Sequence, residues 1–304
     1  MKLKLDINDL NRIANIELLA RQLVEGFVTG LHKSPYHGFS VEFAEHQLYN
    51  SGESTRHVDW KVFAKTDKLY TKRYEEETNL RCYIALDTSS SMFYPQPGFG
   101  KLKYSILSAA ALALLMQRQR DAVGLFTFSD MIDFQSEIRS TSKHIRSLLQ
   151  KLQELSDHTI KGKKTNVAAT IHEIADKIPR RSLVILMSDM LDTFNDESQE
   201  LFSALQHLKH NKHEVILFHI NDSKTELELQ LEDRPYKFED IETGEIVKLT
   251  PSQIKDGYHQ QMSAIHRALY LKCTQLKIDF VNADINSGFE QMFSSYLIKR
   301  NKMV

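Results

Sequence analysis

Cysteine is scarce in this chain, and so is any surplus of one charge. The two cysteines, Cys82 and Cys273, lie far apart and lack the C-x-x-C spacing of a zinc or redox site. The 39 Lys and Arg residues are balanced by 40 Asp and Glu residues, so the basic field that drives nucleic-acid binding is missing. We therefore expect a protein of a reducing compartment that does not bind nucleic acid.

Long hydrophobic runs are also missing. The longest nearly apolar stretch, YSILSAAALALLM at 104–116, is shorter than the roughly 20 residues that cross a bilayer. The N-terminal segment MKLKLDINDL carries aspartates where a signal peptide needs apolar residues. With 41% hydrophobic and 26% charged residues among 304, the composition is that of a globular protein. These features predict a cytoplasmic chain without a transmembrane segment.

The hydrophobic pattern divides the chain into an N-terminal appendage, residues 1–79, and an α/β domain, residues 80–304. In the appendage, apolar residues at three- and four-residue spacing predict a helix from about 6 to 31, and aromatic segments such as VEFAEHQLY and KLYTKRY predict short strands. In the domain, the apolar runs CYIAL, AVGLFTF, SLVILM and EVILFHI suit strands that are buried on both faces, and LKIDFV predicts a further strand that completes the sheet.

Helical patterns alternate with these runs, at 101–120, 141–155, 166–178, 196–210, 251–272 and 287–298. This alternation predicts an α/β fold with a doubly wound, mostly parallel open sheet of Rossmann type and helices on both faces. A charged segment at about 222–250 interrupts the pattern and contains the turn signal Thr243-Gly244. We expect an inserted hairpin there.

Oxygen-bearing side chains follow two of the predicted strands. Asp87, Ser89 and Ser91 lie in the segment DTSSS after CYIAL, Asp189 follows LVILM, and Thr165 precedes a helix. In an open α/β sheet, ligands collect outside the carboxyl ends of the strands, so we expect these side chains at one edge. They are the oxygen ligands that a small hard cation such as Mg²⁺ (or Mn²⁺) prefers. The structural alternative assigns the same residues to helix capping, loop hydrogen bonds and a turn.

Those five residues resemble the metal-ion-dependent adhesion site of von Willebrand factor A domains. The preceding segment, LYNSGESTRHVDWKVFAKTDKLYTKRYEEE at 48–77, resembles the signature of the bacterial domain-of-unknown-function 58 family, in which a Y-x-x-G-D-x-x-R-x-I-D-W-K-like stretch precedes such a domain. The resemblance implies a von Willebrand factor A-like fold. It also implies a metal site with one open position, which a partner protein fills with an Asp or Glu carboxylate.

The resemblance further implies a non-enzymatic adaptor or co-chaperone, with no catalytic residues, that works with a MoxR-type AAA+ ATPase in assembly or maturation of a protein complex. Two alternatives stay open: an Mg²⁺-dependent phosphohydrolase that uses Asp87, and a metal-free scaffold. Phosphatases with an aspartyl-phosphate intermediate need a second aspartate where this chain has Ser89. Lys163 and Lys164, which precede Thr165, would oppose metal binding if they faced the ion.

Overall fold

The computed structural model describes residues 15–31, 46–48, 60–67, 69–72, 80–95, 100–157, 166–191, 198–239 and 246–303. The chain forms two compact units, of which the smaller comprises residues 30–79. That unit contains helix α3 (Trp60–Thr66) and an antiparallel pair of strands, β1 (His46–Leu48) and β2 (Tyr70–Lys72). Both strands fall within the aromatic segments that the sequence predicts as short strands.

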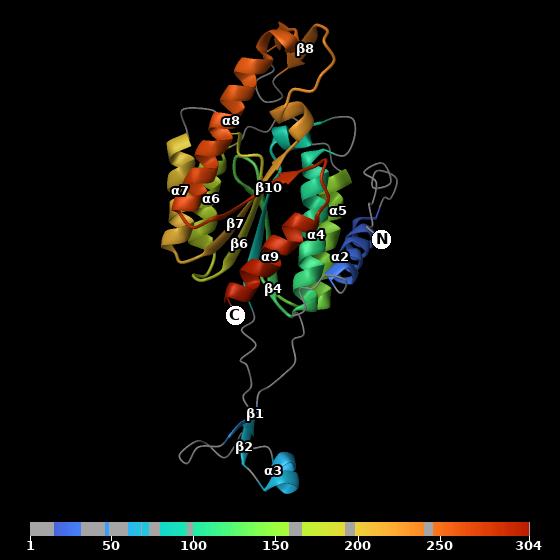
Figure 1. The fold of residues 1–304 in the computed structure, drawn as a ribbon, viewed down its shortest axis with the longest axis vertical. Coiled ribbons are helices and arrows are strands. Elements are labelled where there is room, and N and C mark those ends of the chain that lie inside the picture. Colours follow the sequence, from blue (N-terminus) through green and yellow to red (C-terminus); the bar gives the residue numbers. More distant parts are fainter. Residues whose placement is uncertain are drawn as a thin grey trace. The chain divides into compact units, whose positions relative to one another are not determined.

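A six-stranded sheet forms the centre of the larger unit (Figure 1). Its order is β10-β7-β6-β3-β4-β5, and every neighbouring pair is parallel except β4 and β5. The strands are β3 (Arg81–Asp87), β4 (Ala122–Phe128), β5 (Ile132–Gln135), β6 (Leu183–Ser188), β7 (Glu214–Asn221) and β10 (Asp279–Asp284). The prediction of a doubly wound, mostly parallel α/β sheet is confirmed.

The two edge strands differ from the sequence prediction. The hydrophobic pattern does not predict β5, because its four residues are alternately half-buried and exposed and form no apolar run. β10 begins three positions later than the run LKIDFV at 276–281 and includes Asn282 and Asp284. An edge strand has only one neighbour and is covered less completely, so its polar residues break the pattern on which the prediction depends.

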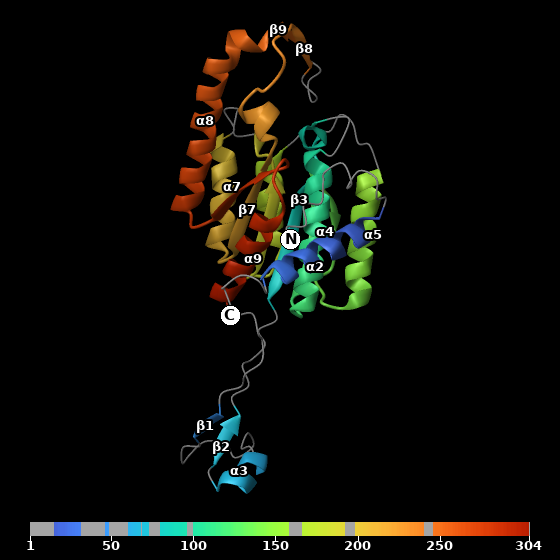
Figure 2. The same ribbon diagram turned by 45° about the vertical axis from the view of Figure 1, so that its right-hand side comes forward.

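Helices cover both faces of the sheet (Figures 1 and 2). One face carries α6, α7 and α8, while α4, α5 and α9 lie on the other side. Their bounds are α4 (Lys101–Arg118), α5 (Ser142–Asp157), α6 (Val167–Lys177), α7 (Ser198–His210), α8 (Pro251–Gln275) and α9 (Glu290–Met303). No helix within the described part of the chain is long and apolar enough to cross a membrane.

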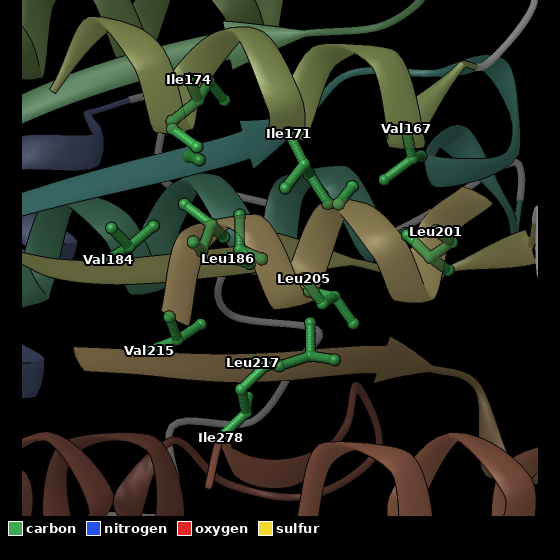
Figure 3. Close-up of a cluster of buried hydrophobic side chains, with 14 of the residues drawn as sticks. Val167, Ile171, Ile174, Val184, Leu186, Leu201, Leu205, Val215, Leu217 and Ile278 are labelled. Carbon is green, nitrogen blue, oxygen red and sulfur yellow. The ribbon is translucent and has the colours of Figure 1, made fainter. Parts of the chain in front are cut away.

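The apolar core on the α6–α7 face fixes the position of the central strands (Figure 3). Leu186 of β6 and Leu217 of β7 lie in one cluster with Ile171 of α6 and Leu205 of α7, and all four are fully buried. Burying a Leu or Ile side chain stabilises a fold by about 1.5–3 kcal/mol. The strand ends that carry the polar residues described below therefore project from a closely packed core.

Helix α2 (Ile16–Leu31) belongs, up to residue 29, to the larger unit. Its apolar face, including Leu19 and Val24, is buried. The rings of Phe27 and Phe293 in α9 lie with centroids 5.1 Å apart. The smaller unit ends at residue 79, where the appendage was expected to end, but residues up to 29 group with the α/β sheet and not with that unit. Amphipathic spacing predicts that a helix needs an apolar surface but does not say which one.

The charged segment at 222–250 forms the expected hairpin. A π-helical turn, η4 (Ser223–Leu227), follows β7, and β8 (Tyr236–Glu239) pairs antiparallel with β9 (Ile246–Leu249) before α8 begins. Figures 1 and 2 show α8 extending past the sheet, with the hairpin at its start. This insertion therefore lies at the end of the sheet where β7 terminates.

Candidate functional site

The order of the strands places Asp87 where the sheet changes direction. The chain continues from β3 to its neighbour β4 on one side, then crosses to β6 on the other side and proceeds outward to β7 and β10. The crevice at such a switch point, outside the carboxyl ends of the strands, is the usual ligand site of open α/β sheets. Asp87 is the last residue of β3 and is fully buried.

The loop after β3 folds back onto the Asp87 carboxylate. The backbone N–H of Ser89 donates to Asp87 Oδ1 at 2.9 Å, and the hydroxyl oxygens of Ser89 and Ser91 lie 3.1 Å apart. Both serines are buried. The structure thus brings together three of the five predicted residues within one tight loop.

The other carboxylate oxygen of Asp87 accepts a hydrogen bond from Ser188, a residue that the sequence pattern does not single out. Ser188, the last residue of β6, donates its hydroxyl to Asp87 Oδ2 at 2.6 Å and accepts the Met190 N–H at 2.9 Å. Met190 itself has a positive φ of 52°, which is uncommon for a residue other than glycine. This turn directs the backbone away from the strand immediately after Asp189.

Two opposing effects act on the Asp87 carboxyl. Burial and then the nearby charge of Asp189 raise the pKa of Asp87 to about 7, while the hydrogen bonds from Ser188 and Ser89 act in the lowering direction. The group is therefore poised between its neutral and charged forms near physiological pH. A positive charge placed beside it would favour the carboxylate.

Asp189 lies at the same edge but is paired with a lysine. Lys101, the first residue of α4, is fully buried, and its Nζ lies 2.8 Å from Asp189 Oδ2. The same ammonium forms an ion pair with Glu226 of η4. Burial alone would lower the pKa of Lys101, but the carboxylates of Asp189 and Glu226 outweigh burial and raise it, so the ammonium stays charged. The sequence pattern singles out neither Lys101 nor Glu226.

A histidine holds the backbone of Asp189 in place. His219 Nε2 lies 3.0 Å from the carbonyl oxygen of Asp189, to which it must donate because a carbonyl only accepts. Burial, followed by the neighbouring His266, lowers the pKa of His219 to about 4. The ring is therefore a neutral hydrogen-bond donor at physiological pH and adds no charge to the site.

The remaining predicted residue, Thr165, lies outside the described residues, as do Lys163, Lys164 and the Gly52-Glu53 pair of the family signature. The next residue, Asn166, caps α6 by accepting the Ala169 N–H at 3.0 Å. Its own N–H donates to the carbonyl oxygen of Ser129, just after β4, at 3.4 Å. The start of α6 thus lies beside the end of β4, the strand next to β3.

The family model described as Protein of unknown function DUF58 matches residues 45–268. The chain belongs to this family. The resemblance predicted from residues 48–77 and the DTSSS segment is therefore confirmed at the level of the family.

This DUF58 chain shares a low sequence identity with the following proteins. It is 23% identical over 193 residues to the uncharacterized protein Mb1516 of Mycobacterium bovis, an alignment that covers 62% of this chain and 61% of that protein. Among solved structures, it is similar to the conserved hypothetical protein BatB of Bacteroides thetaiotaomicron, with 18% identity, coverage of 74% and 98%, and a TM-score of 0.43. It is also similar to the SpRpn10 VWA domain, with 15% identity, coverage of 47% and 76%, and a TM-score of 0.31.

The donors at the edge of the DUF58 sheet fit a hard divalent cation. The described residues contain no group of three or more His, Cys, Asp or Glu side chains arranged to hold a metal ion. A site built from two carboxylates and serine hydroxyls instead offers only oxygen, the donor set of Mg²⁺, which usually keeps several water ligands. With all three ionised, Asp87, Asp189 and Glu226 exceed the single ammonium of Lys101 by two negative charges. A divalent cation would neutralise that surplus.

A cavity of about 300 Å³ adjoins this edge. It lies between the end of β7, η4 and α8, and Asp189 and Glu226 contribute to its lining. Apolar walls come from Leu191, Ile220, Leu227 and Met262. Residues of the insertion and of the middle of α8 thus line the cavity beside the candidate metal residues.

Proposed function

We propose that this DUF58 chain is a non-enzymatic protein-binding module with an Mg²⁺ (or Mn²⁺) site at Asp87, Ser89, Ser91, Thr165 and Asp189. The observation that carries this proposal is the cluster of buried carboxylate and hydroxyl oxygens at the switch point of the sheet. When bound, the cation would supply a positive centre that an Asp or Glu side chain of a partner protein can share. The chain's own residues hold and orient the ligands of that centre.

The groups around Asp87 support binding over catalysis. An aspartyl-phosphate mechanism needs a second aspartate two residues after the nucleophile as its acid or base, and this chain has Ser89 there. The neighbouring carboxylate, Asp189, is paired with Lys101. We therefore prefer a binding role to phosphoryl transfer by Asp87.

The partner in this proposal is a protein with an acidic residue in its docking segment. The adjoining cavity offers apolar surface beside the place where the partner's carboxylate would bind, as the buried core of a protein interface does. From the family resemblance, the proposal includes a cytoplasmic role as an adaptor or co-chaperone of a MoxR-type AAA+ ATPase. The metal-free scaffold remains the competing function.

Thermal unfolding of the wild type and Asp87→Ala, in millimolar Mg²⁺ and in EDTA, tests the metal site. A cation present at a hundred times its dissociation constant stabilises the folded state by roughly 2.7 kcal/mol. We expect Mg²⁺ to raise the melting temperature of the wild type but not of Asp87→Ala. Equal curves for the wild type in Mg²⁺ and EDTA would favour the metal-free scaffold.

An array of acidic peptides then tests protein binding. We expect the wild type to be retained by a subset of Asp- or Glu-containing peptides in Mg²⁺, and to be lost from them in EDTA. The matched peptides with Asn or Gln in place of the acid are the control. Equal retention by acidic and amide peptides would contradict a shared metal–carboxylate bond even if the metal site exists.

A further inference from the structure

Lys101 is held rigidly at the edge of the site. Gly100, which precedes it, lies so close to the loop after β3 that an added Cβ would be 2.9 Å from the carbonyl oxygen of Phe93. The Lys101 N–H donates to the carbonyl oxygen of Tyr94 at 2.9 Å. The ammonium is therefore carried by a helix start that is fixed against the same loop as Ser89 and Ser91.

The carboxylate on the far side of Lys101 is equally well positioned. Glu226 Oε2 accepts the Asp222 N–H at 2.8 Å, and its carbonyl oxygen accepts the hydroxyl of Tyr258 in α8 at 2.7 Å. Lys101 thus connects Asp189, which follows β6, to a glutamate of the inserted segment after β7. A buried lysine in this position adds one positive charge beside the residues proposed to bind a cation.

We propose that Lys101 is a built-in counter-cation that weakens the binding of a divalent cation at Asp87 and Asp189. This inference rests on the proposed metal site. Because like charges repel strongly where water is excluded, the ammonium opposes the incoming cation, whereas Glu226 attracts it. The ion pair also supplies a positive partner for Asp189 when no metal is bound, so the edge does not need the metal in order to fold.

A series of charge variants tests the role of Lys101 by isothermal titration calorimetry with Mg²⁺ and Mn²⁺. We expect Lys101→Met to bind the cation at least tenfold more tightly than the wild type, a difference of about 1.4 kcal/mol. Glu226→Gln should bind more weakly than the wild type. The double variant Lys101→Met/Glu226→Gln removes one charge of each sign, so its affinity should return to within about threefold of the wild type.

Lys103→Met is the matched control, because Lys103 is exposed and lies two residues along the same helix. It should bind the cation as the wild type does. If Lys101→Met does not fold in EDTA, Glu226→Gln and the double variant still decide the question, since the latter leaves no unpaired buried carboxylate at position 226. The melting temperature of each variant in EDTA reports whether it is folded.

The possible results separate the two proposals. Unchanged or weaker binding in Lys101→Met, or loss of binding in the double variant, would overturn the counter-cation role while leaving the metal site intact. Tighter binding in Lys101→Met with a wild type too weak to measure would support it. If neither cation binds any folded variant, both the counter-cation role and the proposed metal site fall.

Discussion

Replacing Asp87 with asparagine should stabilise the folded protein at pH 8, although removing a buried hydrogen-bond partner usually destabilises a fold. The pKa of Asp87 is about 7 in the folded protein, against an ordinary value of 3.8. Between those values the folded chain keeps a proton that the unfolded chain has released, so the free energy of unfolding falls as the pH rises. The difference of roughly three pKa units corresponds to about 4 kcal/mol lost by pH 8.

An asparagine at this position cannot ionise, so the variant avoids this loss, but it gives up a hydrogen bond. The new amide nitrogen would face the Ser188 hydroxyl, which now donates to Asp87 Oδ2 at 2.6 Å, and such a mismatch costs about 1–2 kcal/mol. In EDTA at pH 8, we therefore expect Asp87→Asn to be about 2–3 kcal/mol more stable than the wild type. That gain corresponds to a rise of about 5–10 °C in melting temperature. At pH 5 the wild type has lost only about 1.6 kcal/mol, which is similar to the cost of the mismatch, so the two proteins should be about equally stable there.

The assay is thermal unfolding by circular dichroism from pH 5 to pH 8 in EDTA, repeated in millimolar Mg²⁺. Mg²⁺ should stabilise the wild type at pH 8 and leave Asp87→Asn unchanged, because the cation compensates the charge that the variant lacks. Asp130→Asn, which changes an exposed carboxylate at the same edge, is the control and should follow the wild type. Parallel curves for Asp87→Asn and the wild type across this pH range would refute the reasoning.

Three further substitutions test other parts of the structure. Ser188→Ala should lower the free energy of unfolding by about 1–3 kcal/mol in urea at pH 8, and by less in the Asp87→Asn background because the two side chains interact. Asp121→Asn removes the buried carboxylate that pairs with Arg300 of α9 at 2.6 Å, and urea unfolding should show a loss of about 2–4 kcal/mol. An unchanged midpoint would mean that the other contacts of α9, which include the ion pairs of Lys299 with Glu214 and Asp279, are sufficient to hold it. Met262→Trp narrows the cavity beside the site. It should reduce retention of the protein on the acidic peptides without changing the rise in melting temperature that Mg²⁺ causes. Unaltered retention would mean that the partner does not bind in this cavity.

The central strands could be predicted because they are buried on both faces. β3, β4, β6 and β7 are nearly continuous apolar runs, so composition alone distinguishes them from their surroundings. Their alternation with helices then predicts a doubly wound, mostly parallel sheet. The short edge strand β5 carries no such signal, and the packing of α2 on the α/β unit depends on surfaces that a sequence pattern does not identify.

At the site, residues that are close in the chain could be predicted to lie together, but an ion pair between residues far apart in the chain could not. Asp87, Ser89 and Ser91 are close together in the chain, and the strand ends bring Asp189 to the same edge. Glu226, by contrast, meets Lys101 across 125 positions. The segment GKLKY contains two lysines, of which only the first is buried, and nothing in the letters separates them. The packing of the start of α4 against the loop after β3 determines which of the two lysines is buried at the site.

The buried charges at this edge are difficult to explain as part of the scaffold. Apolar side chains are buried close by at the ends of the neighbouring strands, Phe128 in β4 and Met187 in β6. Replacing a buried ion pair by well-packed apolar residues is often neutral or stabilising, and Asp87 with its raised pKa reduces stability at neutral pH. A fold that keeps Asp87, Asp189, Glu226 and Lys101 together therefore tolerates a local destabilisation that binding of a cation would remove. Local conflict with the rules of burial is expected at functional sites, and here it coincides with the switch point of the sheet.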